Sequence, residues 1–317
     1  MKKFKYIVPL KKSKMRCFKL LAALLAVLLF LSACAGIGTT KNVETVGETH
    51  IGTQGIYFDF LPNYPPPIIY LSGQDTGTNI VLDVKNLGSF TTSVYFFLSG
   101  FDPSIVKLSE ATHVIGTIEG KSPTNPEGGY AQVQFPTYGT LNVNMPKNID
   151  VYPMTIQATA CYDYETKASI PVCVDPNPYS PITQKACIPH GAAVAGGQGA
   201  PVAITSVEQE SLKGKTIFKI HISNTGGGQV YEKGNTQLCT KLPYDKFNKI
   251  TYSPFKLGGA AGQCTPASPI RLSTGGTALI TCVFNVAGDL AYTTTLDADL
   301  MYGYMFSRQR SVQIKKI

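Results

Sequence analysis

The sequence contains no tryptophan, which weakens any interpretation that depends on a sugar-stacking platform. It also contains no C-x-x-C pair, no G-x-x-x-x-G-K-[ST] loop, no G-x-S-x-G elbow and no H-E-x-x-H helix. These four patterns mark paired-cysteine metal sites, nucleotide-binding loops, serine hydrolases and zinc proteases. Their absence leads us to expect no cofactor, no metal and no enzyme activity.

The chain has few charged residues for its length, and their distribution is uneven. The formal net charge is +8, from 28 basic and 20 acidic residues. Eight of the basic residues lie in the first 19 positions, where there is no acidic residue, so residues 34–317 hold 20 of each sign. Nucleic-acid binding needs a concentrated basic surface, and no basic run follows residue 20. We therefore expect no nucleic-acid partner.

The amino-terminal segment has the three parts of an export signal. A basic stretch precedes the apolar run Leu20–Leu31, and the small residues Ser32 and Ala33 precede Cys34. Residues 31–34 resemble the lipobox of prokaryotic lipoproteins, which implies lipidation of Cys34 after removal of a signal peptide, residues 1–33. An uncleaved membrane anchor is the alternative, and the basic leader would then still place the body outside the cytoplasm. Both interpretations predict an extracytoplasmic protein anchored to a membrane, at the cell surface or on a periplasmic face.

Cysteine content agrees with export. Besides Cys17 and Cys34, the chain holds an even set of disulfide candidates: Cys161, Cys173, Cys187, Cys239, Cys264 and Cys282. An even number of cysteines in an exported chain indicates disulfide bonds.

Residue alternation at period two dominates the remainder, and no long stretch has helical spacing. The clearest examples are residues 80–86, 154–164 and 296–304, each with an apolar and a polar face. Glycine, proline and asparagine turns interrupt these segments. The pattern predicts an all-β fold of antiparallel sheets that are covered on one side.

An internal repeat divides the chain into two halves. Residues 80–88 and 218–226 share the pattern Φ-x-Φ-x-Φ-x-N-x-G, and Tyr162-x-Tyr164 matches Tyr302-x-Tyr304 at nearly the same offset. The repeat indicates tandem duplication. The predicted organisation is a tether at 34–55, a first β-sandwich at 56–185, a Gly-rich joint at 186–199 and a second β-sandwich at 200–317.

The Φ-x-Φ-x-Φ-x-N-x-G strand resembles the tandem immunoglobulin-like, adhesion-related (CARDB-like) modules of prokaryotic surface proteins. The resemblance implies two immunoglobulin-like antiparallel sandwiches with no transferable activity. The core tryptophan of antibody domains is absent.

Cysteine pairing is left with alternatives. If each half ends in a hairpin, Cys161 falls opposite Cys173, so these two bond each other or one of them bonds Cys187. A Cys239–Cys264 bond would pin the long loop between them. Complete pairing requires at least one bond between the halves; otherwise two thiols stay free, with the inward-facing Cys282 as the first candidate.

The remaining polar candidates have simple structural interpretations. His50, His113, His190 and His221 are scattered. Asp297 and Asp299 alternate on one strand face, where calcium binding is conceivable but a solvent-facing role is simpler. We expect the tyrosines at positions 57, 64, 70, 130 and 138 to be mostly strand and core residues.

These patterns predict a non-catalytic binding or adhesion protein whose partners are a membrane, through Cys34, and another protein or an envelope component. Self-association is compatible with the sequence. The alternatives are a structural subunit of a surface layer, filament or envelope complex, and an envelope enzyme or ligand carrier with a site at the joint.

Overall fold

The computed structural model describes residues 50–181, 184–194 and 196–317. The predicted signal peptide, the lipidation candidate Cys34 and the tether up to residue 49 lie outside the described residues. The described residues belong to one compact unit, Thr45–Ile317. Among them are many β-strands and two short 3-10 helices, and all pairs of named strands except β2 with β20 are antiparallel. The all-β prediction is confirmed.

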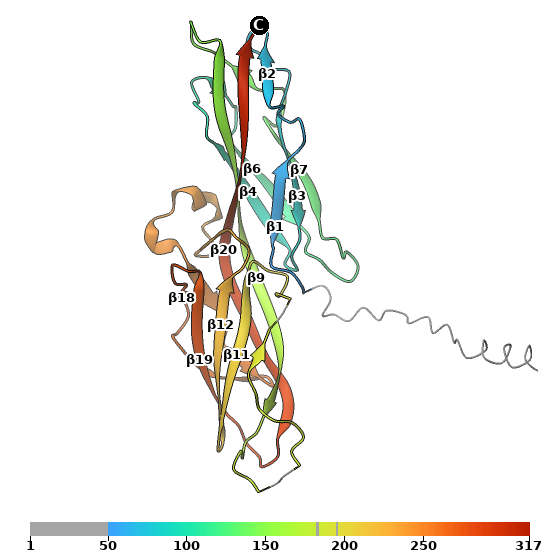
Figure 1. Ribbon diagram of the computed structural model, residues 1–317, viewed down its shortest axis with the longest axis vertical. Helices are drawn as coiled ribbons and strands as arrows, with labels where there is room; N and C mark the ends of the chain where they lie inside the picture. Colours follow the sequence, from blue (N-terminus) through green and yellow to red (C-terminus); the bar gives the residue numbers. More distant parts are fainter. Residues whose placement is uncertain (1–49, 182–183, 195) are drawn as a thin grey trace, which may run out of the picture. The chain divides into compact units, whose positions relative to one another are not determined.

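Two long strands form the centre of the unit. They are β9 (Val151–Val174) and β20 (Tyr292–Lys316), which lie side by side in Figure 1. They pair antiparallel from Tyr292 opposite Val174 to Lys315 opposite Val151. Alternation runs through both strands, so one face carries tyrosine and aliphatic side chains while the other is mostly polar.

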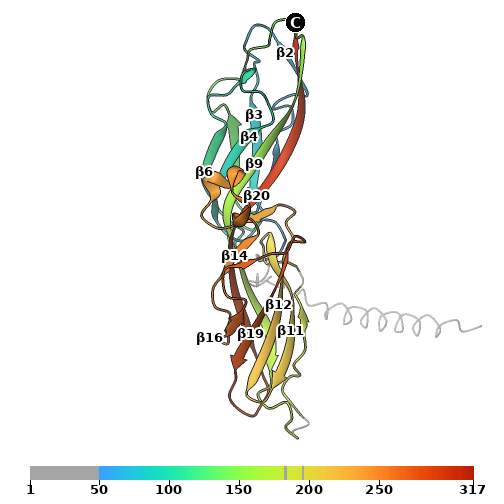
Figure 2. The same cartoon turned by 90° about the vertical axis from the view of Figure 1, so that its left-hand side faces the viewer.

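A separate sheet packs against each end of this central sheet. The first has the order β1-β3-β7, from β1 (Ile56–Phe60), β3 (Ile80–Asn86) and β7 (Tyr130–Phe135). The second has the order β10-β11-β12-β19-β17, and Figure 2 shows β11, β12 and β19 beside one another. Its strands are β10 (Ala192–Ala193), β11 (Val202–Leu212), β12 (Lys215–Asn224), β17 (Gln263–Thr265) and β19 (Thr277–Asn285).

Shorter elements complete the layers. They are β2 (Ile68–Leu71), β4 (Thr92–Ser99), β5 (Val106–Lys107), β6 (Thr112–Ile118), β8 (Asn142–Val143), β13 (Gln229–Tyr231), η2 (Thr236–Lys241), η3 (Tyr244–Lys246), β14 (Lys249–Tyr252), β15 (Lys256–Leu257), β16 (Ala260–Ala261) and β18 (Ile270–Arg271). The core between the layers includes edge-to-face ring pairs, Phe58 with Phe96 and Phe218 with Phe284.

Matched positions of the sequence repeat make equivalent contacts. The Tyr164 hydroxyl donates to Asn86 Oδ1 at 3.3 Å, and the Tyr304 hydroxyl donates to Asn224 Oδ1 at 2.9 Å. Because Tyr164 pairs with Tyr302 and Tyr162 with Tyr304, equivalent residues exchange places across the β9–β20 pair. This local two-fold relation supports tandem duplication.

The glycine two residues after each asparagine explains why both motifs share the spacing N-x-G. A Cβ on Gly88 would lie 2.0 Å from the Tyr164 hydroxyl oxygen, and one on Gly226 would lie 2.6 Å from the Tyr304 hydroxyl oxygen. Only glycine leaves room for the tyrosine that the asparagine binds. The motif is therefore a tyrosine-binding strand end.

The two predicted halves share strands. The expected hairpin with Cys161 opposite Cys173 is wrong, because residues 151–174 form one uninterrupted strand whose partner along its whole length is β20. The predicted start of the first sandwich coincides with β1 at Ile56. The predicted joint is partly a strand, β10, which pairs with β11. The two-domain boundaries stay a prediction.

All six candidate cysteines form disulfide bonds: Cys161–Cys239, Cys173–Cys187 and Cys264–Cys282. The Cys173–Cys187 bond is one of the predicted alternatives, whereas the Cys161–Cys173 and Cys239–Cys264 bonds are wrong. Cys282 faces the core as expected but is not a free thiol, because it lies opposite Cys264 in the β17–β19 pair. The Cys161–Cys239 bond joins the two halves of the repeat.

Candidate binding surface around the 232–248 insert

Residues 232–248 form an insert between β13 and β14, which contains η2 and η3. Both flanking strands pair with β20: Tyr231 lies opposite Gly303, and Thr251 lies opposite Met301. Between them the chain leaves the sheet, and η2 contacts β4 and β9. The insert is the orange segment beside β4 and β20 in Figure 1. It therefore covers the polar-side face of the central sheet.

The insert begins on a close approach between a ring and a backbone. The Tyr231 ring is fully buried, and a Cβ on Gly303 would lie 2.1 Å from its Cε2 atom. In the equivalent position of the first half stands Asp163, whose carboxylate accepts the Gly234 N–H at 3.0 and 3.1 Å. Burial raises the pKa of Asp163. The two-fold relation is broken at this position, because Gly303 leaves room for the Tyr231 ring, whereas Asp163 binds the backbone of the insert.

A covalent bond fixes the far side of the insert. Cys239 in η2 is fully buried and bonded to Cys161 of β9. These two cysteines and Tyr231 form a small apolar cluster with partly buried neighbours that include Tyr95 and Leu242. The Gln237 side-chain amide donates to the Tyr95 hydroxyl at 3.0 Å. The insert is thus held to strands from both halves.

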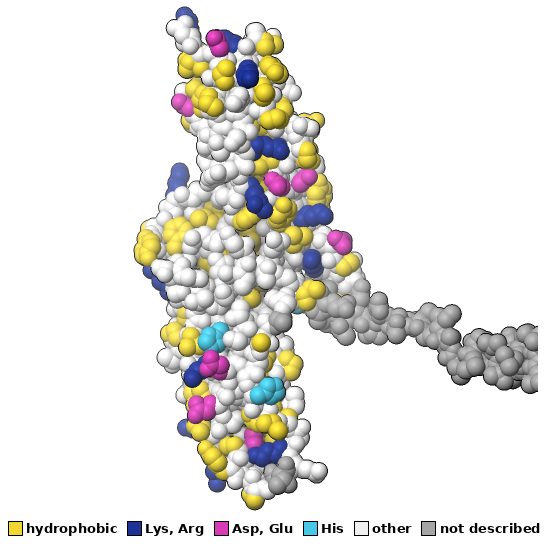
Figure 3. All heavy atoms as spheres, viewed as in Figure 1, with side chains coloured by type: hydrophobic (Ala, Val, Ile, Leu, Met, Phe, Trp, Pro, Cys, Tyr) yellow, Lys and Arg dark blue, Asp and Glu magenta, His cyan; other side chains and the backbone are white. Residues whose placement is uncertain are grey.

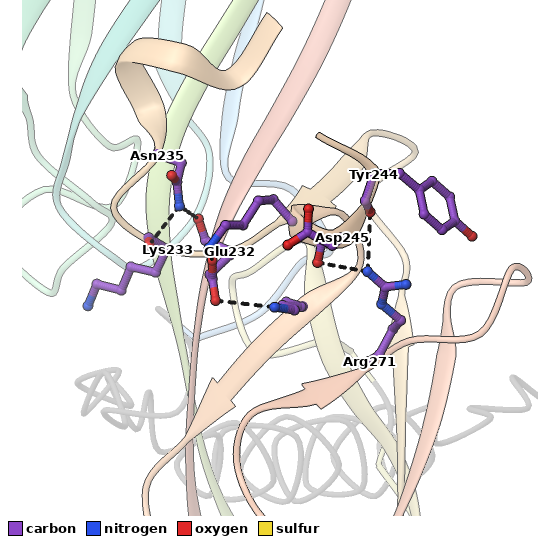
Figure 4. A network of polar contacts seen from close by, with 8 residues as sticks. Glu232, Lys233, Asn235, Tyr244, Asp245 and Arg271 are labelled. Atoms are coloured by element: carbon purple, nitrogen blue, oxygen red, sulfur yellow. Dashed lines mark hydrogen bonds and ion pairs between the residues drawn. The ribbon is translucent and has the colours of Figure 1, made fainter. Parts of the chain in front are cut away.

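Charged groups hold the two ends of the insert together, as Figure 4 shows. Glu232 forms ion pairs with Lys246 and, at 3.5 Å, with Lys249, and the hydrogen bond from Lys246 lowers the pKa of Glu232. The Arg271 guanidinium donates to the carbonyl oxygens of Tyr244, at 3.2 Å, and Asp245, at 2.7 Å. The same guanidinium lies 5.2 Å from the centre of the Tyr244 ring.

The outer side of the insert exposes apolar side chains on this fixed backbone. Tyr244 is 78% exposed and Leu238 is 60% exposed. Figure 3 shows apolar side chains gathered over this protruding segment. Lys233 and Lys241 of the insert are exposed as well. The arrangement is suited to contact with another macromolecule, because tyrosine and apolar anchors dominate the energy of protein interfaces.

A groove of about 510 Å³ lies at the predicted joint. Its lining includes His50, Lys167, Gln198, Asp297 and Asp299. The Gln198 amide is occupied by the backbone of Ile204, to which it both donates and accepts.

The two aspartates of this groove lie on the polar face of β20. Asp297 accepts the Ser169 hydroxyl at 2.7 Å and the Thr295 hydroxyl at 3.3 Å. Both Asp297 and Asp299 are members of an alternating strand, as the simpler interpretation predicts, but they are half-buried rather than fully solvent-facing.

The structure does not bring the four histidines together. His113 lies on β6 with its ring 5.9 Å from Phe135, His190 Nδ1 contacts the Ile188 carbonyl, and His221 Nε2 contacts Glu208 at 2.9 Å. Within the described ranges, no group of three or more His, Cys, Asp or Glu side chains could hold a metal ion.

The expectation that most of the five singled-out tyrosines are strand and core residues is met for the strands, since Tyr57, Tyr70 and Tyr130 lie on β1, β2 and β7, but it is wrong for the core. Four of them are exposed on strands or loops: Tyr64, Tyr70, Tyr130 and Tyr138. The sequence signal for the insert was Cys239, a cysteine in a long segment without periodicity.

No family model matches the chain, and no curated protein matches it. None of the described helices is long and apolar enough to cross a membrane. The three disulfide bonds indicate an oxidising, extracytoplasmic environment.

Proposed function

We propose that the protein is an exported, membrane-anchored binding protein that acts without catalysis through immunoglobulin-like sandwiches. The observation that supports this most directly is the 232–248 insert, a covalently fixed projection that exposes Leu238 and Tyr244. The disulfide bonds support export, and the lipobox-like residues 31–34 support anchoring through lipid on Cys34.

The insert has the physical properties of a docking site. Its backbone is fixed by Cys161–Cys239, by the Arg271 hydrogen bonds and by the Glu232 ion pairs, so a partner would have little loop entropy to remove. Burial of the exposed 60% of Leu238 stabilises a complex by about 1–2 kcal/mol. The exposed lysines favour a partner surface that carries acidic groups.

The immunoglobulin-like assignment rests on the repeated strand order. β1-β3-β7 in the first half corresponds to β11-β12-β19 in the second, and each set packs on the shared pair β9 and β20. Each set ends its middle strand with the asparagine that binds a tyrosine. The groove at the joint favours a structural role for its polar side chains over the binding of a carried ligand, since Gln198 and Asp297 already bind protein groups.

Site-specific photo-cross-linking in the cells that export the full chain tests the proposal. A benzophenone amino acid at Tyr244 is expected to give one discrete adduct, whereas the same group at Tyr138, which is 89% exposed elsewhere, is not. Absence of an adduct at Tyr244, or equal adducts at both positions, would contradict the proposal. In the same experiment, Cys34→Ser is expected to move the protein from the membrane fraction to the medium.

A further inference from the structure

The ten-stranded central sheet ends at β6, and no described strand pairs with the other side of that strand. β6 pairs with β4 through Phe97 opposite Thr112 and Val94 opposite Ile115. An edge strand with free backbone groups is a template for another strand. Whether it is used depends on its direction, its charge and its neighbours.

The backbone direction of β6 follows from one hydrogen bond. Leu98 N–H donates to the Ala111 carbonyl at 2.8 Å, so the backbone groups of Ala111 face β4. Because these groups alternate in an antiparallel ladder, His113 and Ile115 also face β4, whereas Thr112 and Val114 present their N–H and C=O groups outward. The edge therefore offers two donors and two acceptors.

A bulge limits the length of edge that can pair. Thr92 lies opposite Ile118 and Val94 opposite Ile115, so Ser93 faces both Gly116 and Thr117. The regular part of the edge is residues 111–115, and its centre is His113.

The segment is uncharged and lacks the usual protection of an edge. Residues 111–118 contain no Lys, Arg, Asp, Glu or Pro. The open side of β9 beyond Asp163 differs, because it carries Glu165, Lys167 and Pro171. Lysine and proline block strand addition, so β6 favours pairing more than the open side of β9 does.

The outer face of the edge strand β7 is polar. Its exposed Tyr130 and Gln132 side chains both donate to Asp83, at 2.8 and 2.7 Å, and form a polar network. β6 instead exposes Val114, which is 46% exposed.

Val114 lies on the same sheet face as the insert. It lies opposite Tyr95, which in turn lies opposite Cys161, the residue that anchors the insert. The exposed apolar surface at the edge is therefore continuous with the cluster below the insert.

From these observations we infer that β6 pairs with β6 of a second copy of this chain, antiparallel and centred on His113. In this register Thr112 lies opposite Val114 of the copy and Val114 opposite Thr112, so both outward residues of each copy exchange hydrogen bonds. The bulge excludes a register shifted toward residue 116. The result is a symmetric dimer in which the two central sheets continue into each other.

A five-residue pairing is short, so it gives a weak dimer in dilute solution. Anchoring two copies in one membrane would raise their effective concentration and favour the pairing. The inference rests on the β6 edge alone and does not depend on the partner proposed for the insert.

Cysteine cross-linking of the full chain in membranes tests the pairing. Across the two-fold axis, the Cβ atoms of the two His113 residues would be about 4.5–5.5 Å apart. His113→Cys is therefore expected to give a disulfide-linked dimer on mild oxidation, and the matched variant Thr117→Cys, at the bulge, is not. Equal dimer from both variants, or none from His113→Cys, would overturn the inference.

A second pair of variants keeps the test decisive if a cysteine at 113 disturbs folding. Coexpressed Thr112→Cys and Val114→Cys copies are expected to form a mixed dimer, whereas Thr112→Cys alone does not. Adding Val114→Pro to His113→Cys removes an outward N–H and is expected to abolish the cross-link, while Val114→Thr keeps it. A cross-link that survives Val114→Pro refutes strand pairing. Loss of the Tyr244 adduct would leave these results unchanged, so the two proposals fail separately.

Discussion

Removal of the Cys161–Cys239 bond is expected to destabilise the protein more than removal of either other disulfide. The residues it joins are 78 positions apart, compared with 14 for Cys173–Cys187. By the loop-entropy relation, closing the larger loop in the unfolded chain contributes about 4.5 kcal/mol, and closing the smaller one about 3 kcal/mol. Nesting of the smaller loop inside the larger one changes the first figure by only about 0.2 kcal/mol.

The assay is urea unfolding of two double variants under non-reducing conditions. One is Cys161→Ala with Cys239→Ala, and the matched control is Cys173→Ala with Cys187→Ala. Tyrosine fluorescence and far-ultraviolet circular dichroism are suitable probes, since the chain has no tryptophan. We expect the first variant to lose roughly 1.5 kcal/mol more free energy of unfolding than the control.

The structure also fixes where the first variant becomes less protected. Amide hydrogen exchange is expected to rise in residues 232–248, because the bond holds η2 to β9. A loss equal to or smaller than that of the control, with unchanged denaturant slopes, would refute the reasoning. Unchanged exchange in the insert would show that the ion pairs and Arg271 alone fix it.

Two further predictions concern the centre of the sheet. Gly303→Ala is expected to cost about 1–3 kcal/mol of unfolding free energy, because its Cβ would lie 2.1 Å from the Tyr231 ring, whereas Gly116→Ala, with no atom within 4 Å, should be nearly neutral in thermal unfolding. Burial raises the pKa of Tyr304 to about 12, from an ordinary value of 10.0. The neutral form is thus favoured in the fold, so stability is complete below pH 10 and is lost as the pH rises toward 12, by on the order of 2–3 kcal/mol for this residue. Alkaline titration should show tyrosine ionisation together with unfolding, and independent ionisation of buried tyrosines in folded protein would contradict this.

Local patterns were sufficient to predict the class of fold. Alternation in residues 80–86, 154–164 and 296–304 predicted strands with one buried face, and the structure has strands there. Such alternation is a property of the pleat itself and needs no knowledge of neighbours. The nearly equal spacing of Asn and Tyr in the two halves, 78 and 80 residues, also corresponds to real contacts, as the Asn86–Tyr164 and Asn224–Tyr304 hydrogen bonds demonstrate.

The predicted hairpin failed for a physical reason. The alternating residues 162–164 and 172–174, two tyrosines followed ten residues later by two valines, suit a short hairpin. They suit one long strand equally well, since the period of the alternation is the same. The long strand is formed because β20 pairs with β9 along its whole length. The pairing of Cys161 depended on that choice and moved to Cys239.

The insert surface was largely invisible in the sequence. Leu238 and Tyr244 lie in a segment without periodicity. No pattern within the segment indicates that Arg271 and Asp163 bind its backbone. These contacts join residues that are tens of positions apart. A surface of this kind is set by tertiary folding alone.

Near neighbours along the chain are enough to show which segments alternate as strands, which face of each is buried, the even set of cysteines and the two asparagine–glycine motifs. Contacts between distant segments were needed to show that β9 and β20 serve both halves, which cysteines bond, and that η2 lies over the central sheet. These outcomes depend on register and packing between distant segments, where many arrangements satisfy the same local pattern and burial of the shared core selects one.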